Sequence, residues 1–575
     1  MSDADSTAAA SDRADAPATT APGGFRDRYA VLLLLAALAL IHVGLWRASG
    51  YLGDVGVFVA KADALNRAGQ VTANLYLTVH QACLLLAPYP LDAHNLVRLI
   101  ASAMSVFGLY GLLRASRLCR PFGALAASIL WIATILCVPY AQIALSNLFA
   151  YALCLCGLAG LTGGFTWRRW LVALATAYLA AKCRPEYLGV LAALLAIAGL
   201  HLAVAVWRAR REQTAAAALA PRRADWLAAG VVSLLMLTCS ALPKADADSA
   251  GADAYLLLGF HQSYALYHNR NHGADAFINP WLESMPLTAR EFGDPQGLSD
   301  VIRHEPGKFV DYIWDNSRHN LPFVLPAIMQ TRSPPGGSRI GLGMIQMGKL
   351  LAGATVLAAI AAVVLALRRR RPGLRELAGL LLDLRVQVLA SLLIAAGLPL
   401  LMYGRESRLY VSLVPLAFLP LAWALGRLLS LPRPRWAWLA CGLLALAMCR
   451  PLFPGRPSNR PLIDELRRRG LTLQEPVTIG GPNSRELGGL ALGAGQEGYT
   501  NLDQHLVDTM QDGGYDFVVF SHGLGRSSLF RQHREFFSTF LARPELFGYG
   551  HVITNEADDE YLILFQRNPI QTESP

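Results

Sequence analysis

The sequence predicts a mainly α-helical, polytopic membrane protein with about 11 transmembrane helices, and three observations support this fold class. Hydrophobic residues make up 54% of the 575 residues and charged residues only 16%, a balance that water-soluble globular chains rarely reach. Apolar runs of roughly 20 residues, the length that crosses a bilayer, recur along the chain. Short basic clusters flank alternate runs, so the net charge of +10 indicates membrane topology rather than nucleic-acid binding.

Every second loop between the predicted spans carries a basic cluster. This alternation places the N-terminus inside and the C-terminus outside. Two spans, at 167–181 and 434–449, have short apolar cores that are equally typical of re-entrant segments. The full set is 29–47, 97–113, 122–140, 143–162, 167–181, 187–207, 226–243, 349–367, 386–404, 409–426 and 434–449.

Three regions follow from this pattern. Residues 1–24 form a polar tail that we expect to be disordered and cytoplasmic. Residues 25–450 form the transmembrane domain, with outer loops at 48–96 and 245–345 that carry interfacial helices. Residues 451–575 read as a small extracytoplasmic α/β domain, with helices near 501–511 and 528–541 and strands at 476–481, 515–520, 550–554 and 560–566.

Two motifs in the C-terminal domain resemble nucleotide or hydrolase signatures, and neither has the right context. GAGQEG (493–498) matches the GxGxxG pattern, but no strand is predicted directly before it and no helix opens within it, so a flexible surface loop is the better reading. SHGLGRSS (521–528) follows a strand but lacks the GxSxG spacing of a nucleophile elbow.

Asp54 is the first candidate for chemistry, because it lies a few residues beyond the first predicted span. It stands before VGVFVAKADAL, so it can cap the helix that follows and do nothing else. A carboxylate held at a helix start near the bilayer surface can also accept a proton. Both roles remain open, and they are compatible.

Cations in two very short outer loops form the second set of candidates. Lys182 and Arg184 lie in one loop, and Arg405 and Arg408 lie in another. Cations are disfavoured on the outer side, and the planar arginine fork suits phosphate oxygens, so these residues are expected to bind a lipid phosphate. The alternative is simple ion pairing with neighbouring carboxylates such as Glu186.

The long outer segment contains FHQSYALYHNRNHG (260–273). His268 and His272 have the spacing of two metal ligands on a helix, but no third ligand accompanies them, so no metal site is predicted. His261 and His268 are candidates for lining a sugar pocket, with ordinary packing as the alternative. Residues 291–320 read as amphipathic helices on the bilayer, with Phe309 and Trp314 among the apolar contacts.

Taken in order, these parts resemble the GT-C superfamily of polyprenyl-phosphate-sugar-dependent glycosyltransferases. The likeness covers about residues 25–450 and rests on GDVGVFVAKADALNRAGQ (53–70), the KCRPEY turn (182–187) and GRESRLYVSLVPLAFLPLAWAL (404–425). Two positions depart from the pattern: Val55 stands where many members have a second acid, and Asn147 stands where many have an acid opening the fourth span.

The resemblance implies an inverting transfer of a sugar from a polyprenyl-phosphate donor to an envelope glycan, lipid or protein acceptor. Asp54 would be the base, and Lys182, Arg184, Arg405 and Arg408 would bind the donor phosphate. Glu186, Asn147, His261 and His268 are further substrate-binding candidates. The implied location is the inner membrane of a bacterium, with no cofactor required and no divalent metal indicated.

Two other classes of function stay open. A transporter or flippase of a lipid-linked substrate would need charged or helix-breaking residues in mid-span and internal symmetry, and the sequence shows neither feature clearly. An envelope assembly protein that has lost the chemistry is supported by Asn147 and by the missing second acid.

Overall fold

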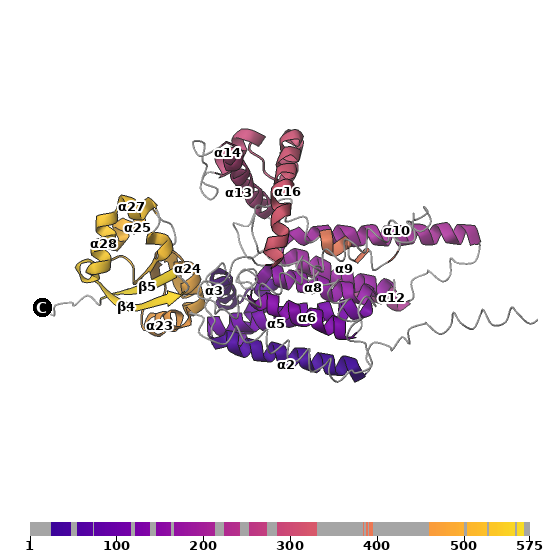
Figure 1. The fold of residues 1–575 in the computed structure, drawn as a ribbon, viewed down its shortest axis with the longest axis horizontal. Coiled ribbons are helices and arrows are strands. Elements are labelled where there is room, and N and C mark those ends of the chain that lie inside the picture. Colours follow the sequence, from indigo (N-terminus) through magenta and orange to yellow (C-terminus); the bar gives the residue numbers. More distant parts are fainter. Residues whose placement is uncertain are drawn as a thin grey trace, which may run out of the picture.

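The computed structural model describes most of the N-terminal and C-terminal thirds of the chain (Figure 1). The predicted tail at 1–24 and the predicted spans at 349–367, 409–426 and 434–449 lie outside the described residues, and of the span at 386–404 only residues 387–388 and 390–394 are described. The described residues are 25–47, 55–72, 74–116, 121–137, 145–162, 166–212, 223–241, 252–272, 284–329, 383, 387–388, 390–394, 459–499, 503–525, 528–557 and 560–568.

A helical bundle occupies the centre of the molecule (Figure 1). Its helices fall at the first seven predicted spans, and α5 packs most extensively on α8, which in turn packs on α9. The helices are α2 (Phe25–Arg47), α5 (Pro90–Ala115), α6 (Pro121–Cys137), α8 (Leu145–Leu161), α9 (Trp167–Cys183), α10 (Leu188–Glu212) and α12 (Arg223–Ala241).

The prediction of about 11 transmembrane helices is wrong for the part of the chain that the structure describes. Only α5 there is both long and apolar enough to cross a membrane, and 61% of its apolar window is buried inside the protein. Helices α6, α8 and α9 have 17 residues each. At 1.5 Å per residue they rise about 26 Å, short of a hydrocarbon core of about 30 Å. In α10 and α12 the apolar stretches are likewise short, at Leu188–His201 and Asp225–Thr238.

An ion pair fixes one end of the bundle. The Arg114 guanidinium donates two hydrogen bonds to the Asp27 carboxylate, at 2.8 and 3.1 Å, and the Tyr110 hydroxyl donates a third at 2.7 Å. These bonds connect the start of α2 to the end of α5. The pair is bidentate and largely buried, so each charge is compensated by hydrogen bonds to the other in a place that water reaches little.

Two helices from the predicted outer loop at 48–96, α3 (Val55–Arg67) and α4 (Leu75–Leu86), cover one end of the bundle. The sequence predicted interfacial helices in this loop, so the stripe of apolar residues on α3, which includes Val59 and Ala62, would lie on the bilayer surface. Instead Val59 and Ala62 are completely buried, because α3 packs on α4, on α5 and on the C-terminal domain. In this protein the stripe is therefore part of the core.

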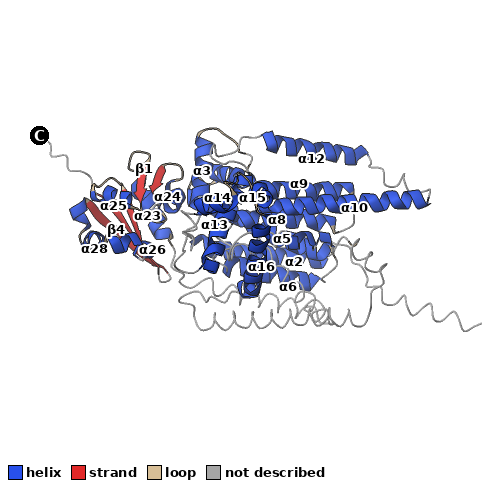
Figure 2. Ribbon diagram, turned by 90° about the horizontal axis from the view of Figure 1, so that it is seen from above, coloured by secondary structure: helices blue, strands red, loops and turns tan. Residues whose placement is uncertain are grey.

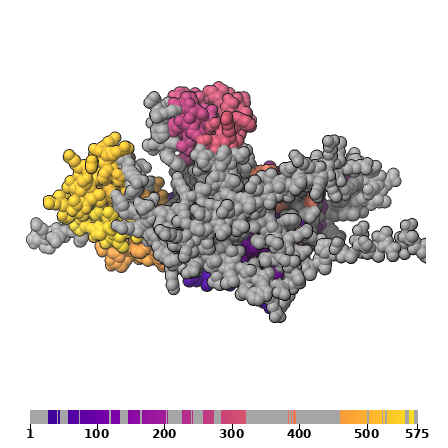
Figure 3. All heavy atoms as spheres, viewed as in Figure 1, coloured from indigo at the N-terminus to yellow at the C-terminus, as the bar shows by residue number. Residues whose placement is uncertain are grey.

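A second helical unit projects from the bundle (Figure 3). Its core is aromatic: Phe260, Phe292 and Tyr312 are buried with their rings in edge-on contact. Phe309 packs partly against this core, whereas Trp314 stays 70% exposed. The unit consists of α13 (Ala252–His272), α14 (Ser284–Phe292), α15 (Leu298–His304) and α16 (Pro306–Met329).

The C-terminal domain is a five-stranded mixed sheet between two layers of helices, as seen from above in Figure 2. The strand order is β2-β1-β3-β5-β4, with β1 parallel to both neighbours and β5 antiparallel to β3 and β4. The strands are β1 (Val477–Gly480), β2 (Gln496–Tyr499), β3 (Phe517–Ser521), β4 (Tyr549–Ala557) and β5 (Glu560–Arg567). Each of the four predicted strand segments overlaps an observed strand, and β2 was not predicted.

Side chains of β3 alternate between the two helix layers, as the two-residue period of a strand requires. Phe517 and Val519 face the layer that joins the bundle core, and Val518 and Phe520 face the opposite layer. The first layer holds α23 (Arg460–Gly470) and α24 (Ser484–Leu492). The second holds α25 (Gln504–Gln511), α27 (Ser528–Gln532), α28 (Arg534–Ala542) and the short helices α26 (His522–Gly525) and η5 (Pro544–Phe547).

Close packing of α8 on α9 depends on Gly157, and this dependence can be tested. A Cβ atom at Gly157 would clash with Thr176 and would lie 3.1 Å from the Cα atom of Ala173, whereas a Cβ atom at Gly160 meets nothing within 4 Å. Gly157→Ala is therefore expected to lower the free energy of unfolding by about 1–3 kcal/mol. Gly160→Ala on the same helix should be neutral or slightly stabilising. Thermal unfolding of both variants checks this, and equal effects would contradict the packing.

Candidate functional site

The turn after α9 holds a buried arginine and a buried glutamate. Arg184 is the C-cap residue of α9, and its backbone N–H donates to the carbonyl of Ala180 at 2.8 Å. Its guanidinium lies 4.0 Å from the Glu186 carboxylate, and both side chains are about nine-tenths buried. A cation beside the last carbonyls of a helix is favourable, because these carbonyls carry the negative end of the helix dipole.

This pair corresponds to the ion pairing that the sequence left open as the alternative to phosphate binding. A buried pair pays a large desolvation penalty and recovers it only when every charged atom is well hydrogen-bonded. At 4.0 Å the contact is at the limit of an ion pair, and the Glu186 Oε2 atom is buried with no hydrogen-bond partner in the described structure. The Glu186 carboxylate is therefore buried with only part of its hydrogen-bonding capacity used within the described structure.

Tyr76 connects this turn to the first outer loop. It is completely buried in α4, and it lies close enough to Arg184 and Cys183 to interact with both. Its ring makes an edge-on contact with Phe58 of α3, with ring centroids 5.3 Å apart. Phe58 lies in the first turn of α3, the helix that begins at the residue after Asp54. The start of α3 and the Arg184 turn thus share one aromatic neighbour.

Asn147 and Tyr187 close the opposite side of the turn. The short helix η1 (Pro185–Tyr187) follows Arg184, and the Tyr187 hydroxyl donates to the backbone carbonyl of Asn147 at 3.3 Å. Asn147 is buried near the start of α8. The structure thus pairs Arg184 with Glu186, and Tyr187, the residue after Glu186, connects this turn to the backbone of Asn147.

Lys182 lies apart from this group. Its ammonium group stands 5.4 Å from the centre of the Tyr178 ring, one turn earlier on α9, in a cation–π contact. Asp54, Arg405 and Arg408, the other predicted catalytic and phosphate-binding residues, lie outside the described residues.

His261 and His268 belong to the projecting helical unit. His261 is buried and hydrogen-bonds to Thr288 of α14. His268 stacks on His272 with ring centroids 4.1 Å apart, and the described residues contain no group of three potential ligands that could hold a metal. Helix α13 contacts η1, so this unit adjoins the Arg184 turn without a described hydrogen bond between the histidines and the turn.

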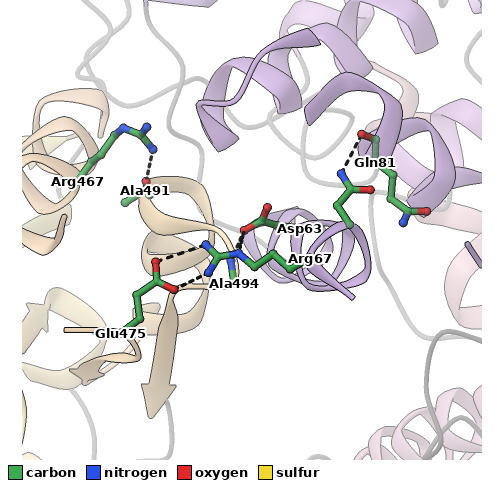
Figure 4. A network of polar contacts seen from close by, with 8 residues as sticks. Asp63, Arg67, Gln81, Arg467, Glu475, Ala491 and Ala494 are labelled. Carbon is green, nitrogen blue, oxygen red and sulfur yellow. Dashed lines mark hydrogen bonds and ion pairs between the residues drawn. The ribbon is translucent and has the colours of Figure 1, made fainter. Parts of the chain in front are cut away.

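The C-terminal domain docks on α3, and this contact was not predicted (Figure 4). A Cβ atom at Gly56 would clash with the backbone carbonyl of Glu486 in α24, and one at Gly489 would clash with the carbonyl of Gly56. The backbones of the two helices therefore touch directly. Two glycines make this approach possible, as small residues do at close helix crossings.

Polar contacts complete the docking at the other end of α3. The Asp63 carboxylate accepts a hydrogen bond from the backbone N–H of Ala494 at 2.9 Å, and Arg67 pairs with Glu475 (Figure 4). Ala494 belongs to the GAGQEG motif, which the sequence analysis assigned to a flexible surface loop. That reading is wrong: the motif ends α24, packs against α3 and leads into β2.

The first residues of α5 hold the neighbouring helix α23. The Tyr89 hydroxyl donates to the Asp464 carboxylate at 2.5 Å, and the Arg467 guanidinium lies 4.4 Å from the centre of the Tyr89 ring. Arg467 also donates to the carbonyl of Ala491 at the end of α24. The domain is thus fixed to α3 and to the start of α5, and α3 lies between it and the bundle.

His80 continues the line of buried rings behind Tyr76. The two rings meet edge-on with centroids 4.5 Å apart, and the His80 Nδ1–H donates to the Tyr76 carbonyl at 3.0 Å. Burial lowers the pKa of His80 to about 4, and the hydrogen bond to Tyr76 only partly opposes this shift. His80 is therefore neutral at pH 7, with its Nε2 atom as an acceptor.

Comparisons with known proteins add no family to this geometry. The chain matches no protein-family model and no curated protein sequence. The functional assignment consequently depends on the arrangement of the residues themselves.

The neutral state of His80 predicts how stability changes with pH. Between pH 6.5 and about 4 the unfolded chain binds a proton that folded His80 excludes, so the free energy of unfolding falls as the pH falls through this range. The full effect corresponds to about 3 kcal/mol. Thermal unfolding at pH 7 and pH 4.5 should show a smaller acid loss for His80→Gln than for the unsubstituted protein. An equal loss in both would contradict the assignment.

Proposed function

We propose that this protein is a membrane glycosyltransferase that moves a sugar from a polyprenyl-phosphate donor to a glycan, lipid or protein acceptor on the outer face of the membrane. The observation that carries this proposal is the position of the Arg184 turn. Through Tyr76 and Phe58 it adjoins the first turn of α3, the helix that begins directly after Asp54. Arg184 and the start of the helix that follows Asp54 thus lie beside the same pair of aromatic rings.

The chemistry needs these two groups on opposite sides of the anomeric carbon. Asp54 would accept the proton of the acceptor hydroxyl as its oxygen attacks C1 of the sugar. The bond from C1 to the phosphate oxygen breaks, and Arg184 would stabilise the negative charge that develops on this oxygen. In-line attack inverts the anomeric centre. The donor already contains an activated bond, so the proposed reaction uses neither nucleotide nor ATP.

Glu186 has a supporting role in this proposal. Its Oε1 atom faces Arg184 at 4.0 Å, which directs the guanidinium, while its Oε2 atom has no partner in the described structure and can accept a hydrogen bond from a sugar hydroxyl. Arrival of a phosphate would add an anionic partner, which the planar Arg184 guanidinium can bind through charge-assisted hydrogen bonds.

The membrane location is supported by the surface of the bundle. Soluble monomers seldom expose large contiguous apolar patches. Here one face of α12 exposes five large apolar side chains: Trp226, Leu227, Val231, Leu234 and Leu237, at 61–74% of their area. Helix α2 similarly exposes Leu32, Leu35, Leu40 and Val43. We propose that lipid acyl chains cover these faces and that the C-terminal domain lies outside the membrane.

Transfer activity tests the proposal directly. Purified protein in lipid vesicles is given several polyprenyl-phosphate sugars and candidate acceptors, and the transferred sugar is measured. Asp54→Asn and Arg184→Gln are each expected to lower the rate by about 100-fold or more, because each removes a group that acts in the transition state. Arg168→Gln is the matched control, since Arg168 is exposed and pairs with Asp225 on the bundle surface.

Two outcomes would contradict the proposal. Full turnover by a folded Asp54→Asn protein would remove the base. Movement of the lipid-linked sugar across the vesicle membrane by the unsubstituted protein, without transfer to any acceptor, would support a flippase instead. Circular dichroism and size-exclusion chromatography establish that each variant is folded.

A further inference from the structure

A second set of buried polar groups lies inside the bundle, behind Tyr76. We call it the Arg98 cluster, and it consists of His80 of α4 with His94, Asn95, Arg98 and Ser102 of α5. His94, Arg98 and Ser102 follow one another at four-residue intervals, so they lie on one face of α5. The His80 and His94 rings are nearly parallel, with centroids 6.2 Å apart. All five residues are buried.

Arg98 is a buried cation that forms no ion pair with a carboxylate in the part of the chain that the structure describes. Its side chain is 4% exposed, and its described hydrogen bond goes to the neutral Asn95 amide oxygen at 2.9 Å. The Nε atom is buried and has no hydrogen-bond partner, and among the described residues no acidic side chain forms an ion pair with this guanidinium. An uncompensated buried charge is strongly unfavourable, so such charges in proteins are normally paired.

Arg114 on the same helix shows what a compensated arginine looks like in this fold. Its guanidinium donates one hydrogen bond to each carboxylate oxygen of Asp27, which makes a bidentate ion pair. Four turns earlier, Arg98 has the same kind of guanidinium in a more buried position with no such partner. The contrast lies within one helix, so it arises from what surrounds each arginine rather than from the helix itself.

The other members of the cluster also have unused hydrogen-bonding atoms. Among the described residues, Ser102 Oγ, His94 Nδ1 and His80 Nε2 are buried without a hydrogen-bond partner. His80 Nε2 is an acceptor, because the Nδ1–H of the same ring donates to the Tyr76 carbonyl. A ligand that satisfies the whole set must offer several acceptor oxygens to Arg98 and Ser102 and a hydroxyl group to His80. A singly protonated phosphate group has this combination.

We propose that the Arg98 cluster is a binding site for a phosphate-class oxyanion. The planar guanidinium fork binds two of the oxygens, the Ser102 hydroxyl donates to an oxygen, and the P–OH group donates to His80 Nε2. The anion neutralises the charge of Arg98. The ligand is either free phosphate or the phosphate headgroup of a lipid, and the proposed transfer reaction is not required for either.

Ligand-induced stabilisation of the full-length protein in detergent tests the site. The unsubstituted protein is titrated with inorganic phosphate, with farnesyl phosphate and with farnesol as the phosphate-free control, and the unfolding temperature is recorded. Binding to the folded state should raise this temperature by about 2 °C or more at saturation. A response to inorganic phosphate identifies the free ion, and a response to farnesyl phosphate alone identifies the lipid headgroup. Arg184→Gln, which removes the cation of the proposed donor site, should keep the response, and its loss in that variant would assign the binding to Arg184 and overturn the proposal. No response to either, or an equal response to farnesol, would overturn the proposal.

Two variants on α5 separate binding from general stability. Arg98→Gln is expected to abolish the phosphate response while leaving the basal unfolding temperature unchanged or higher, because it removes an uncompensated charge. Arg114→Gln should do the opposite: the basal temperature falls, and the phosphate response persists. If Arg98→Gln fails to fold, or if it keeps the response, the cluster is a structural network and not an anion site.

Discussion

The close contact between α3 and α24 is the constraint on which the rest of the candidate site depends. Gly56 and Gly489 let the two backbones touch, and a side chain at either position would clash with a backbone carbonyl. Because α3 begins at Val55, this contact holds the first turn of the helix that follows Asp54. The bundle holds the same turn from the other side, through Phe58 and Tyr76. The start of α3 is therefore fixed between two parts of the chain that are more than 400 residues apart in sequence.

In this arrangement the C-terminal domain has a structural role, because it packs against α3 and the start of α5. Its contacts with α3 and α5 combine a glycine-mediated backbone approach with polar pairs such as Asp63 with Ala494 and Tyr89 with Asp464. The apolar core is continuous across this boundary, since Val59 of α3 and Leu487 of α24 belong to one buried cluster. An interface with a continuous apolar core resists relative motion more than a purely polar one. The domain thus acts as a rigid support for α3.

Local patterns in the sequence predicted much of the secondary structure. Helices occur at the first seven predicted spans because long apolar runs favour helix, and β3 was found because YDFVVF combines β-branched and aromatic residues. Strand β2 was missed because QEGY contains neither a β-branched residue nor a clear alternation. The number of membrane crossings was overestimated because apolar character marks burial as well as contact with lipid. Trp131 of α6 and Leu155 of α8 are completely buried by neighbouring helices.

The site was predictable only in part for the same reason. Short-range spacing identified Arg184 and Glu186. Their pairing could be predicted locally, because the two residues are only two positions apart in the sequence. Tyr76 and the Arg98 cluster depend on which helices become neighbours, which no local pattern reveals.

The most direct measurement of the central claim is an experimental structure in a lipid nanodisc with a polyprenyl-phosphate sugar analogue bound. The account predicts that the donor phosphate lies within hydrogen-bond distance of Arg184, about 2.7–3.2 Å, and that the Asp54 carboxylate faces the opposite side of C1. A donor bound elsewhere, or an Asp54 carboxylate directed away from C1, would contradict it.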